Sequence, residues 1–245
     1  MSTRWTIETH DTVTSTMDLA RKRARAGAPD GLVVVAAEQT SGRGRRGNRW
    51  ESPRGGLWLT VLLRSPDSLG PLVTVAGALA AVAACWRAAG VDVRVKWPND
   101  LYAGGAKLGG VMAEAAARTV LLGIGINANL SAGQLPSTEQ YRTTSLAVEG
   151  GAPVGLVGLR ELLLEELEVR LAMVSGGSLA AVVDEWRARS LELGRRVLAT
   201  RGEETFRGTA LGIREDGGLV VDVEDGERVV LMPHGDVTLG LLRER

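Results

Sequence analysis

The stretch GLVVVAAEQTSGRGRRGNRWESPRGGLWLTVLLR, residues 31–64, places two apolar runs on either side of a segment rich in arginine and glycine. The first run, 31–38, is continuous and bounded by Gly31, and the second run, 56–64, has the same character. Short apolar runs bounded by glycine predict buried strands. The stretch therefore predicts two core strands joined by a basic loop.

The pattern outside this stretch predicts both further strands and helices. Further strands are expected at 5–8, 93–97, 107–115 and 119–129, and helices at 14–26, 69–89, 155–173 and 178–189. The pair 107–115 and 119–129 should be joined around Ala117 and Arg118. From Arg195 to Leu242 the chain reads as short strands interrupted by RGEE, REDGG and EDGE, which is typical of a small antiparallel barrel or sheet. We expect an α+β fold with two domains, 1–190 and 191–245.

The composition limits the classes of function. A chain of 245 residues with 44% hydrophobic residues can form one large core and a small second domain. Its 29 basic and 29 acidic residues give no net charge, which argues against bulk attraction to nucleic acid or to an anionic membrane. The most apolar stretch, 72–86, is shorter than the roughly 20 residues of a membrane span, and a single cysteine, Cys85, excludes an internal disulfide. We expect a cytoplasmic protein without a membrane partner, whose anion binding is local.

The segment SGRGRRGNRW, residues 41–50, is suited to holding an anion. Gly42, Gly44 and Gly47 allow close approach of the backbone, and arginine forks match carboxylate or phosphate oxygens two at a time. Five arginines between 43 and 54 repel one another, so we expect a lid that becomes ordered when a ligand binds. A solvated basic loop and an RNA-binding patch remain alternatives. Trp50 could stack on a base or simply pack.

A second segment, VKWPNDLYAGGAKLGG, residues 95–110, contains two of only three lysines in the chain. A lysine is a compact, mobile charge that can follow an oxygen as negative charge develops, and Lys107 precedes a bare LGG backbone. Asn99 and Asp100 could ligate Mg²⁺ or bond a nucleotide. The alternative is a hairpin turn with a surface lysine.

Two further places could contact a ligand. In GIGIN, residues 123–127, Gly123 and Gly125 leave a slot on one face of a strand for another backbone or a flat ligand, and Asn127 would face the same slot. Close packing of strands explains the glycines equally well. Ser15 and Thr16 stand at a helix start, where such residues usually serve as N-caps.

Taken together and in this order, TSTMD, EQTSGRGRRGNRW, VKWPNDLY, KLGG and GIGIN resemble the biotin protein ligase family across nearly the whole chain. The resemblance implies a mixed sheet flanked by helices, similar to class II aminoacyl-tRNA synthetases, with a small SH3-like C-terminal barrel. It also implies two reactions. Biotin and Mg·ATP give biotinyl-5′-AMP and pyrophosphate, and a lysine of a biotin carboxyl carrier domain then takes the biotin and displaces AMP.

The resemblance also assigns roles to residues. The biotin contacts would be Ser15, Thr16, Met17, Gln39, Gly42, Arg43, Gly44, Arg45, Lys107, Gly110 and Gly123. The ATP and adenylate contacts would be Arg43, Arg45, Trp50, Asn99, Lys107 and Asn127. Arg43, Lys107 and Asp100 would be catalytic, and Mg²⁺ would be carried mainly by ATP with Asp100 as a candidate ligand.

The chain departs from the family pattern at two positions. Met17 follows Ser-Thr where asparagine is common, and Asn48 follows the last loop glycine where many members have a basic residue. The chain also begins at the catalytic domain without a helix-turn-helix, so we expect an enzyme that does not bind DNA. A lipoate or octanoate ligase or transferase of similar fold and an RNA-binding module are the competing hypotheses.

Overall fold

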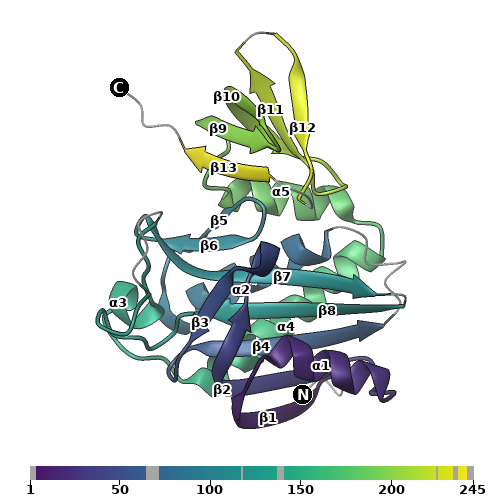
Figure 1. Ribbon diagram of the computed structural model, residues 1–245, viewed down its shortest axis with the longest axis vertical. Coiled ribbons are helices and arrows are strands. Elements are labelled where there is room, and N and C mark those ends of the chain that lie inside the picture. The colour runs from purple at the N-terminus through teal and green to yellow at the C-terminus, as the bar shows by residue number, and fades with distance from the viewer. Residues whose placement is uncertain are drawn as a thin grey trace.

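The computed structural model describes residues 4–64, 72–116, 118–136, 141–224, 226–233 and 237–241. Its main layer is an eight-stranded mixed sheet in the order β1-β2-β4-β8-β7-β6-β5, with β3 paired to β2 (Figure 1). Among the described strands of this sheet, β1 and β2 pair in parallel and the other pairs are antiparallel. The strands are β1 Thr6–Val13, β2 Leu32–Arg43, β3 Arg49–Ser52, β4 Leu57–Arg64, β5 Arg94–Lys96, β6 Asp100–Ala103, β7 Ala106–Ala116 and β8 Thr119–Ile126.

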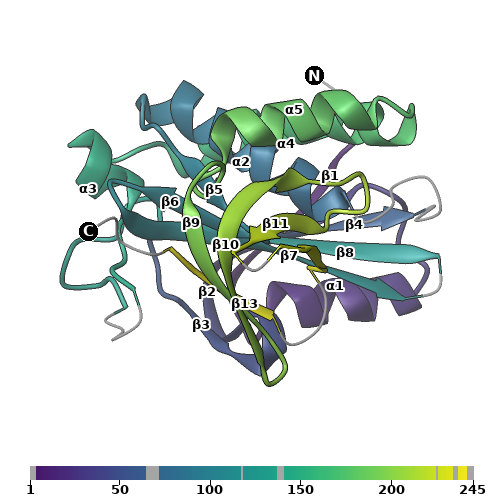
Figure 2. The same cartoon turned by 90° about the horizontal axis from the view of Figure 1, so that it is seen from above.

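Helices cover both faces of this sheet, as Figure 2 shows from above. On one face lies α1, and on the other α2 packs against the sheet with α4 and α5 beyond it. The helices are α1 Thr16–Arg25, the 3₁₀ turn η1 Arg45–Gly47, α2 Val73–Ala89, α3 Leu146–Gly150, α4 Leu156–Ser175 and α5 Leu179–Arg189. The predicted mixed sheet flanked by helices is confirmed. Of the expected helix 69–89, residues 69–71 lie outside the described residues, as does Ala117 of the expected turn.

Alternation along β4 explains why the sheet is buried on both faces. Leu59 and Val61 belong to the core under α2, whereas Leu62 packs with Met17 and Ala20 of α1. Thr60, on the same face as Leu62, bonds to α1 instead. A strand that packs on both faces must be apolar nearly throughout, which is the pattern that the sequence shows.

The helix α2 is buried almost all round because the sheet lies on one side of it and α4 on the other. Its Cys85 is fully buried, and burial raises the pKa of the thiol to about 12, so this cysteine is a packing residue. None of the helices in the described part of the chain combines the length and the apolar character that a membrane crossing requires.

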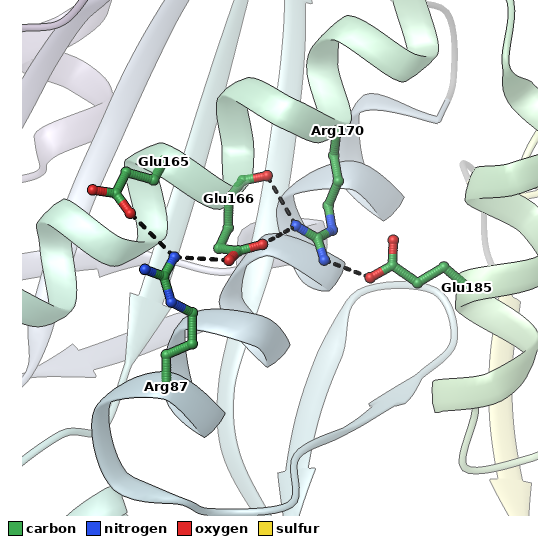
Figure 3. A network of polar contacts seen from close by, with 5 residues as sticks. All are labelled: Arg87, Glu165, Glu166, Arg170 and Glu185. Carbon is green, nitrogen blue, oxygen red and sulfur yellow. Dashed lines mark hydrogen bonds and ion pairs between the residues drawn. The ribbon is translucent and has the colours of Figure 1, made fainter. Parts of the chain in front are cut away.

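A network of ion pairs joins α2, α4 and α5 (Figure 3). Arg87 Nη1 lies 2.9 Å from Glu166, and the nearly buried Arg170 lies 2.5 Å from both Glu166 and Glu185. Burial opposes ionisation of Glu166, but hydrogen bonds from Arg170 and Arg87 hold the pKa of its carboxyl below the usual value. The network therefore fixes α5, the helix that leads into the C-terminal part, against the main domain.

A second, five-stranded antiparallel sheet follows α5, in the order β12-β11-β10-β9-β13. Its strands are β9 Arg196–Arg201, β10 Glu204–Ile213, β11 Leu219–Val223, β12 Arg228–Leu231 and β13 Val237–Leu241. Among the strands that the structure describes, no pairing of β12 with β13 closes it into the expected barrel. Its buried residues, such as Val197 and Val221, are continuous with the core of the main domain. The two sheets are therefore packed as one body.

The connection between the sheets runs along the edge strand β5. Ser190 pairs with Val95, and the Leu191 N–H donates to the Val95 carbonyl at 2.9 Å. Glu192, fully buried, accepts a hydrogen bond from the Trp97 backbone N–H at 2.9 Å. The linker thus extends the main sheet beside the residues that lead into the Pro-Asn-Asp turn.

Candidate functional site

A cavity of about 240 Å³ opens between the start of α1, the arginine loop and the strands β6, β7 and β8. Most of the residues that the sequence singled out line it, although they come from elements far apart in the chain. These are Ser15, Thr16, Met17, Gln39, Arg43, Gly44, Arg45, Trp50, Asn99, Asp100, Lys107, Gly110 and Gly123. The fold therefore brings the quoted motifs together around one space.

One end of the cavity is lined by neutral hydrogen-bonding groups. The Thr16 N–H and hydroxyl both donate to Gln39 Oε1, at 2.8 and 3.0 Å, and Thr16 Oγ1 lies 2.9 Å from Thr60 Oγ1. Gln39 Nε2 in turn donates to Ser52 Oγ at 2.8 Å, so both ends of its amide are fixed. Ser15 is the N-cap of α1, with its side chain facing the Asp18 N–H. This end suits a ligand with neutral donors and acceptors.

Side chains occupy the slot beside the glycines of GIGIN. A Cβ at Gly123 would come within 2.8 Å of Met17 Cε, and a Cβ at Gly125 within 2.9 Å of Trp50 Nε1. Met17 is only 3% exposed and belongs to the core under α1, which gives this position an apolar role. A side chain at Gly125 would therefore displace the Trp50 indole, whereas one at Gly123 would displace only the flexible end of Met17. Trp50 also meets Trp58 edge to face, with ring centroids 6.5 Å apart.

The rest of the lining, around Lys107 and the arginine loop, is strongly basic and is here called the basic end. Six basic side chains and one carboxylate are among the described residues that line the whole cavity: Arg43, Arg45, Arg46, Arg49, Lys96, Lys107 and Asp100. The chain as a whole has no net charge, so this concentration is local. Clustered cations around a partly enclosed space bind anions, because fewer water molecules screen the charges there.

Lys107 is held at the centre of the basic end. Its Nζ lies 2.8 Å from Asp100 Oδ1, 5.3 Å from the ring centroid of Trp50 and 4.8 Å from that of Tyr141. Its side chain is only 12% exposed. Tyr141 reaches this position because the Lys107 N–H donates to the Arg142 carbonyl at 2.8 Å. Lys107 is therefore a positioned charge at the cavity wall.

The arginine loop is shorter than the sequence indicated. Strand β2 continues to Arg43, and β3 pairs Trp50 with Gly42 and Arg49 with Arg43, so the loop is the end of a hairpin. The Gly44 N–H donates to the Asn48 carbonyl at 2.8 Å, and Arg46 adopts the left-handed conformation with φ 58°. A second hollow, of about 780 Å³, lies against the same loop. Ordering of this segment by a ligand stays a prediction.

The two arginines that lead the loop point to different parts of the molecule. Arg43 Nη2 lies 2.8 Å from Asp18 Oδ2 of α1. Arg45 Nη1 donates to Asn99 Oδ1 at 3.2 Å, and its Nη2 donates to the Pro233 carbonyl of the C-terminal part. Burial lowers the pKa of the Arg45 guanidinium, and the neighbouring Arg46 adds to this effect, whereas Asp100 opposes it. Arg45 remains charged at neutral pH, and an anion beside it would stabilise that charge.

The Pro-Asn-Asp turn is supported from two sides. Asn99 Nδ2 donates to the Val111 carbonyl at 2.8 Å, and its Oδ1 accepts from Arg45, so its amide is fully oriented. Just before the turn, Trp97 Nε1 donates to the Gly217 carbonyl of the second sheet at 3.0 Å. The residues Asn99 and Asp100 therefore sit on a rigid support at the basic end of the cavity.

Gly42 and Asn127 are not among the residues that line the cavity. A Cβ at Gly42 would lie 2.3 Å from the Trp50 carbonyl oxygen, so this glycine serves the close approach within the hairpin. Asn127 is buried, and its Nδ2 donates to the Thr144 carbonyl at 3.0 Å. Its Oδ1 is buried without a hydrogen-bond partner among the described residues. A contact of Asn127 with adenine stays a prediction.

Three residues that contact the predicted site residues were not predicted from the sequence. Thr60 bonds Thr16, Ser52 orients Gln39, and Tyr141 lies over Lys107. Thr60 carried a readable signal, because it is the one polar residue within the apolar run 57–63. Ser52 and Tyr141 carried none, since only the tertiary fold brings them to their partners.

Comparison with known proteins assigns both parts of the chain to protein families. Residues 10–131 match the Biotin/lipoate A/B protein ligase family, and residues 193–237 match the Biotin protein ligase C terminal domain. The two matches point to the class of biotin and lipoate protein ligases.

Individual relatives distinguish between the biotin and lipoate branches of this class. The chain is 33% identical over 239 residues to the Bifunctional ligase/repressor BirA of Bacillus subtilis, covering 94% of this chain and 73% of that protein. It is 36% identical over 228 residues to the biotin–[acetyl-CoA-carboxylase] ligase of Mycobacterium tuberculosis, covering 90% of this chain and 83% of that one. The structure of the biotin protein ligase from Aquifex aeolicus in complex with biotin and ATP superposes with a TM-score of 0.84 at 26% identity, covering 96% and 99% of the two chains. The chain belongs to the biotin protein ligase family.

Proposed function

We propose that this chain is a biotin–[biotin carboxyl-carrier protein] ligase, which activates biotin with ATP and transfers it to a lysine of a carrier domain. The observation that carries the proposal is the lining of one cavity, in which the hydrogen-bonded group of Thr16, Gln39 and Thr60 occurs together with six basic residues against one carboxylate among the described lining residues. A ligand with a neutral, hydrogen-bonding ring and an acidic tail fits this lining. The relatives named for biotin ligation and the structure with biotin and ATP support it.

In the first step, a biotin carboxylate oxygen attacks the α-phosphorus of ATP, and the bond to pyrophosphate breaks. Two anions must come within roughly 3 Å of each other, so fixed positive charge is needed to offset their repulsion. Lys107 and the arginines 43 and 45 border the basic end, where this charge would be met. Ser15, Thr16 and Gln39 would hold the ureido ring at the neutral end, beside Gly110 and Gly123. Trp50 would stack on adenine.

In the second step, the amine of an acceptor lysine attacks the acyl carbon, AMP leaves, and the amine loses a proton. The acyl phosphate also reacts with water, so the arginine loop has a second role in excluding solvent. The acceptor is a biotin carboxyl carrier domain, such as that of acetyl-CoA carboxylase. The name of the Mycobacterium tuberculosis relative supports this choice of partner.

The donors at the site fit a magnesium ion that is carried mainly by ATP. Asp100 Oδ1 is engaged by Lys107, so its Oδ2 is the carboxylate oxygen at the basic end that could join the coordination. The described residues contain no cluster of three or more histidine, cysteine or carboxylate groups that could hold the ion alone. When bound, Mg²⁺ would neutralise phosphate charge beside Asn99 and Asp100.

We also propose that residues 1–190 form the catalytic domain and that residues 191–245 form a C-terminal β domain, whose core is continuous with that of the catalytic domain. The second sheet, which begins at Arg196, supports this division. Residues 1–3, 65–71, 117, 137–140, 225, 234–236 and 242–245 of these ranges lie outside the described residues.

The test is to incubate the protein with a biotin carboxyl carrier domain, Mg·ATP and biotin, and to weigh the carrier by mass spectrometry. We expect a mass increase of one biotinyl group, and none when the acceptor lysine is replaced by arginine. Parallel reactions with lipoate and octanoate test the competing ligase hypothesis, and modification by one of these acids instead of biotin would contradict the proposal. Steeply salt-dependent RNA binding that needs Arg43 and Arg45 would favour the RNA-binding alternative.

A further inference from the structure

Arg43 and Asp18 form an ion pair at the rim of the cavity. Arg43 Nη2 lies 2.8 Å from Asp18 Oδ2, while the Arg43 side chain stays 51% exposed. A guanidinium group carries five N–H donors, so a contact through one terminal nitrogen leaves most of the fork available to a ligand. The contact with Asp18 therefore sets the direction of Arg43 without covering it.

Asp18 is itself restrained on its other side. Arg21 Nη1 lies 2.5 Å from Asp18 Oδ1, and Arg21 Nη2 contacts the Glu114 carboxylate of β7. Asp18 also stands in the first turn of α1, where a negative charge is favoured by the helix dipole. Charges of alternating sign thus run from β7 across α1 to the arginine loop. The Asp18 carboxylate is tied to the rigid main layer.

The side chains of the loop border two hollows, so their directions depend on the few contacts that they make. Arg43, Gly44 and Arg45 border both the 240 Å³ cavity and the 780 Å³ hollow. Arg45 is held separately, through Asn99 and Pro233. The two arginines are therefore fixed from different sides, Arg43 by α1 and Arg45 by the Pro-Asn-Asp turn and the C-terminal part.

We propose that Asp18 is a positioning residue that holds Arg43 over the cavity, so that its guanidinium meets the acyl phosphate already oriented. The inference rests on the proposed function for the identity of the ligand. A donor that is oriented beforehand needs no reorganisation as charge develops, which is the source of its contribution to the rate. Asp18 acts through Arg43 and does not touch the reacting atoms.

The first test measures pyrophosphate release with biotin and Mg·ATP in the full chain. Asp18→Asn keeps the size and removes the charge, and we expect it to lower kcat for adenylate formation about tenfold. Asp18→Glu, which keeps the charge, should recover part of this loss. The matched control is Asp184→Asn. Asp184 pairs with Arg187 of α5 at 2.8 Å, the same distance as between Asp18 and Arg43, and neither Asp184 nor Arg187 lines the cavity. We expect this control to retain the wild-type rate.

A double-mutant cycle separates positioning from a general effect on the fold. In an Arg43→Met background, Asp18→Asn should cause no further loss, since the residue through which it acts is gone. A full wild-type rate in Asp18→Asn, or the same fold-loss with and without Arg43, would overturn the inference.

A second readout does not depend on the reaction. Trypsin should cut the ligand-free protein between residues 43 and 49 severalfold faster in Asp18→Asn than in the wild type or in Asp184→Asn, because the loop loses a restraint. Equal cleavage in all three proteins overturns the inference whatever the enzyme does. Faster cleavage combined with a wild type that releases no pyrophosphate with biotin would instead remove the proposed function and keep the restraint.

Discussion

The ammonium group of Lys107 lies between one carboxylate and two aromatic rings, at 2.8 Å from Asp100 Oδ1 and about 5 Å from the rings of Trp50 and Tyr141. Asp100 offsets the charge of Lys107, but five further basic residues border the same cavity, so the lining as a whole keeps an excess of positive charge. A ligand anion would offset this excess. Lys107 is thus the residue at which loss of charge should affect the chemistry most.

We predict that Lys107→Ala lowers the rate of adenylate formation by about two to three orders of magnitude, because no other group replaces a charge placed at the reacting oxygens. The fold should survive, since Asp100 borders an open cavity where water can replace the lysine, at a cost of about 1–3 kcal/mol. Pyrophosphate release with biotin and ATP measures the first effect and thermal unfolding the second. Lys22→Ala, on the exposed side of α1, is the control. A near-normal rate in Lys107→Ala would contradict the role of this lysine.

Along β7, two neighbouring glycines have different reasons to be there. A Cβ at Gly109 would lie 2.4 Å from the Gly125 carbonyl oxygen, which is backbone of the paired strand β8. A Cβ at Gly110 would lie 3.5 Å from Asp100 Oδ1 and 3.7 Å from the Asn99 carbonyl oxygen, which are ordinary contacts. Gly110 lines the cavity and Gly109 does not. One glycine serves the sheet and the other the site.

The two alanine substitutions should therefore affect different properties, one the stability and the other the binding of substrates. Gly109→Ala should destabilise the protein by about 3 kcal/mol, because the methyl group forces β7 away from β8. Gly110→Ala should change the free energy of unfolding by less than about 0.5 kcal/mol, yet raise KM for biotin and ATP, because the methyl group enters the cavity. Urea unfolding and steady-state kinetics of both variants check this. Comparable destabilisation by the two would refute the distinction.

The arginine loop, 43–49, is expected to order further when biotin and ATP bind, because their negative charges would offset the mutual repulsion of its arginines. Trypsin should then cut within the loop quickly in the free protein and slowly with both ligands present. Digestion within the second sheet, for example after Arg207, is the internal control and should not change. Equal loop cleavage with and without ligands would remove the lid hypothesis.

The sequence predicted the features that depend on neighbouring residues and missed those that depend on contacts between distant segments. The apolar runs 31–38 and 56–64 predicted β2 and β4, because alternation and burial are local properties of the chain. The motifs also singled out most of the residues that border the cavity, but Gly42 and Asn127 do not line it. The pairing of β3 with β2 and the contact of Arg45 with Pro233, 188 positions away, could not be read, because they depend on packing between distant segments. The same holds for Met17 and Trp50, whose side chains fill the slot beside Gly123 and Gly125.

At the scale of the whole molecule, polar contacts connect the second sheet and the linker before it to the residues beside the cavity. Glu192 accepts from the Trp97 N–H at 2.9 Å, and Trp97 Nε1 donates to the Gly217 carbonyl at 3.0 Å. The strand before the Pro-Asn-Asp turn is therefore held by the linker and by the second sheet together. This arrangement gives the C-terminal part a structural reason to affect the basic end of the cavity.

Burial of Glu192 makes the stability of this junction depend on pH. Desolvation raises the pKa of its carboxyl from 4.5 to about 8, although Lys96 and hydrogen bonds from Trp97 and Ser190 oppose the shift. Below pH 4.5 the carboxyl is neutral in both the folded and the unfolded chain. Between pH 4.5 and 8 the folded chain holds a proton that the unfolded chain releases, so stability falls as pH rises, by at most about 1.4 kcal/mol per pH unit. Above pH 8 the loss is complete.

Glu192→Gln should remove this dependence, because the amide keeps an acceptor for the Trp97 N–H and carries no charge at any pH. We expect the variant to match the wild type in free energy of unfolding near pH 5 and to exceed it by a few kcal/mol near pH 8, as measured by urea unfolding across this range. Glu203→Gln, which removes a carboxylate from the exposed turn between β9 and β10, controls for the change in net charge and should follow the wild-type pH dependence. Parallel pH profiles for the wild type and Glu192→Gln would mean that Glu192 is ionised in the folded protein, with Lys96 and its hydrogen bonds offsetting burial.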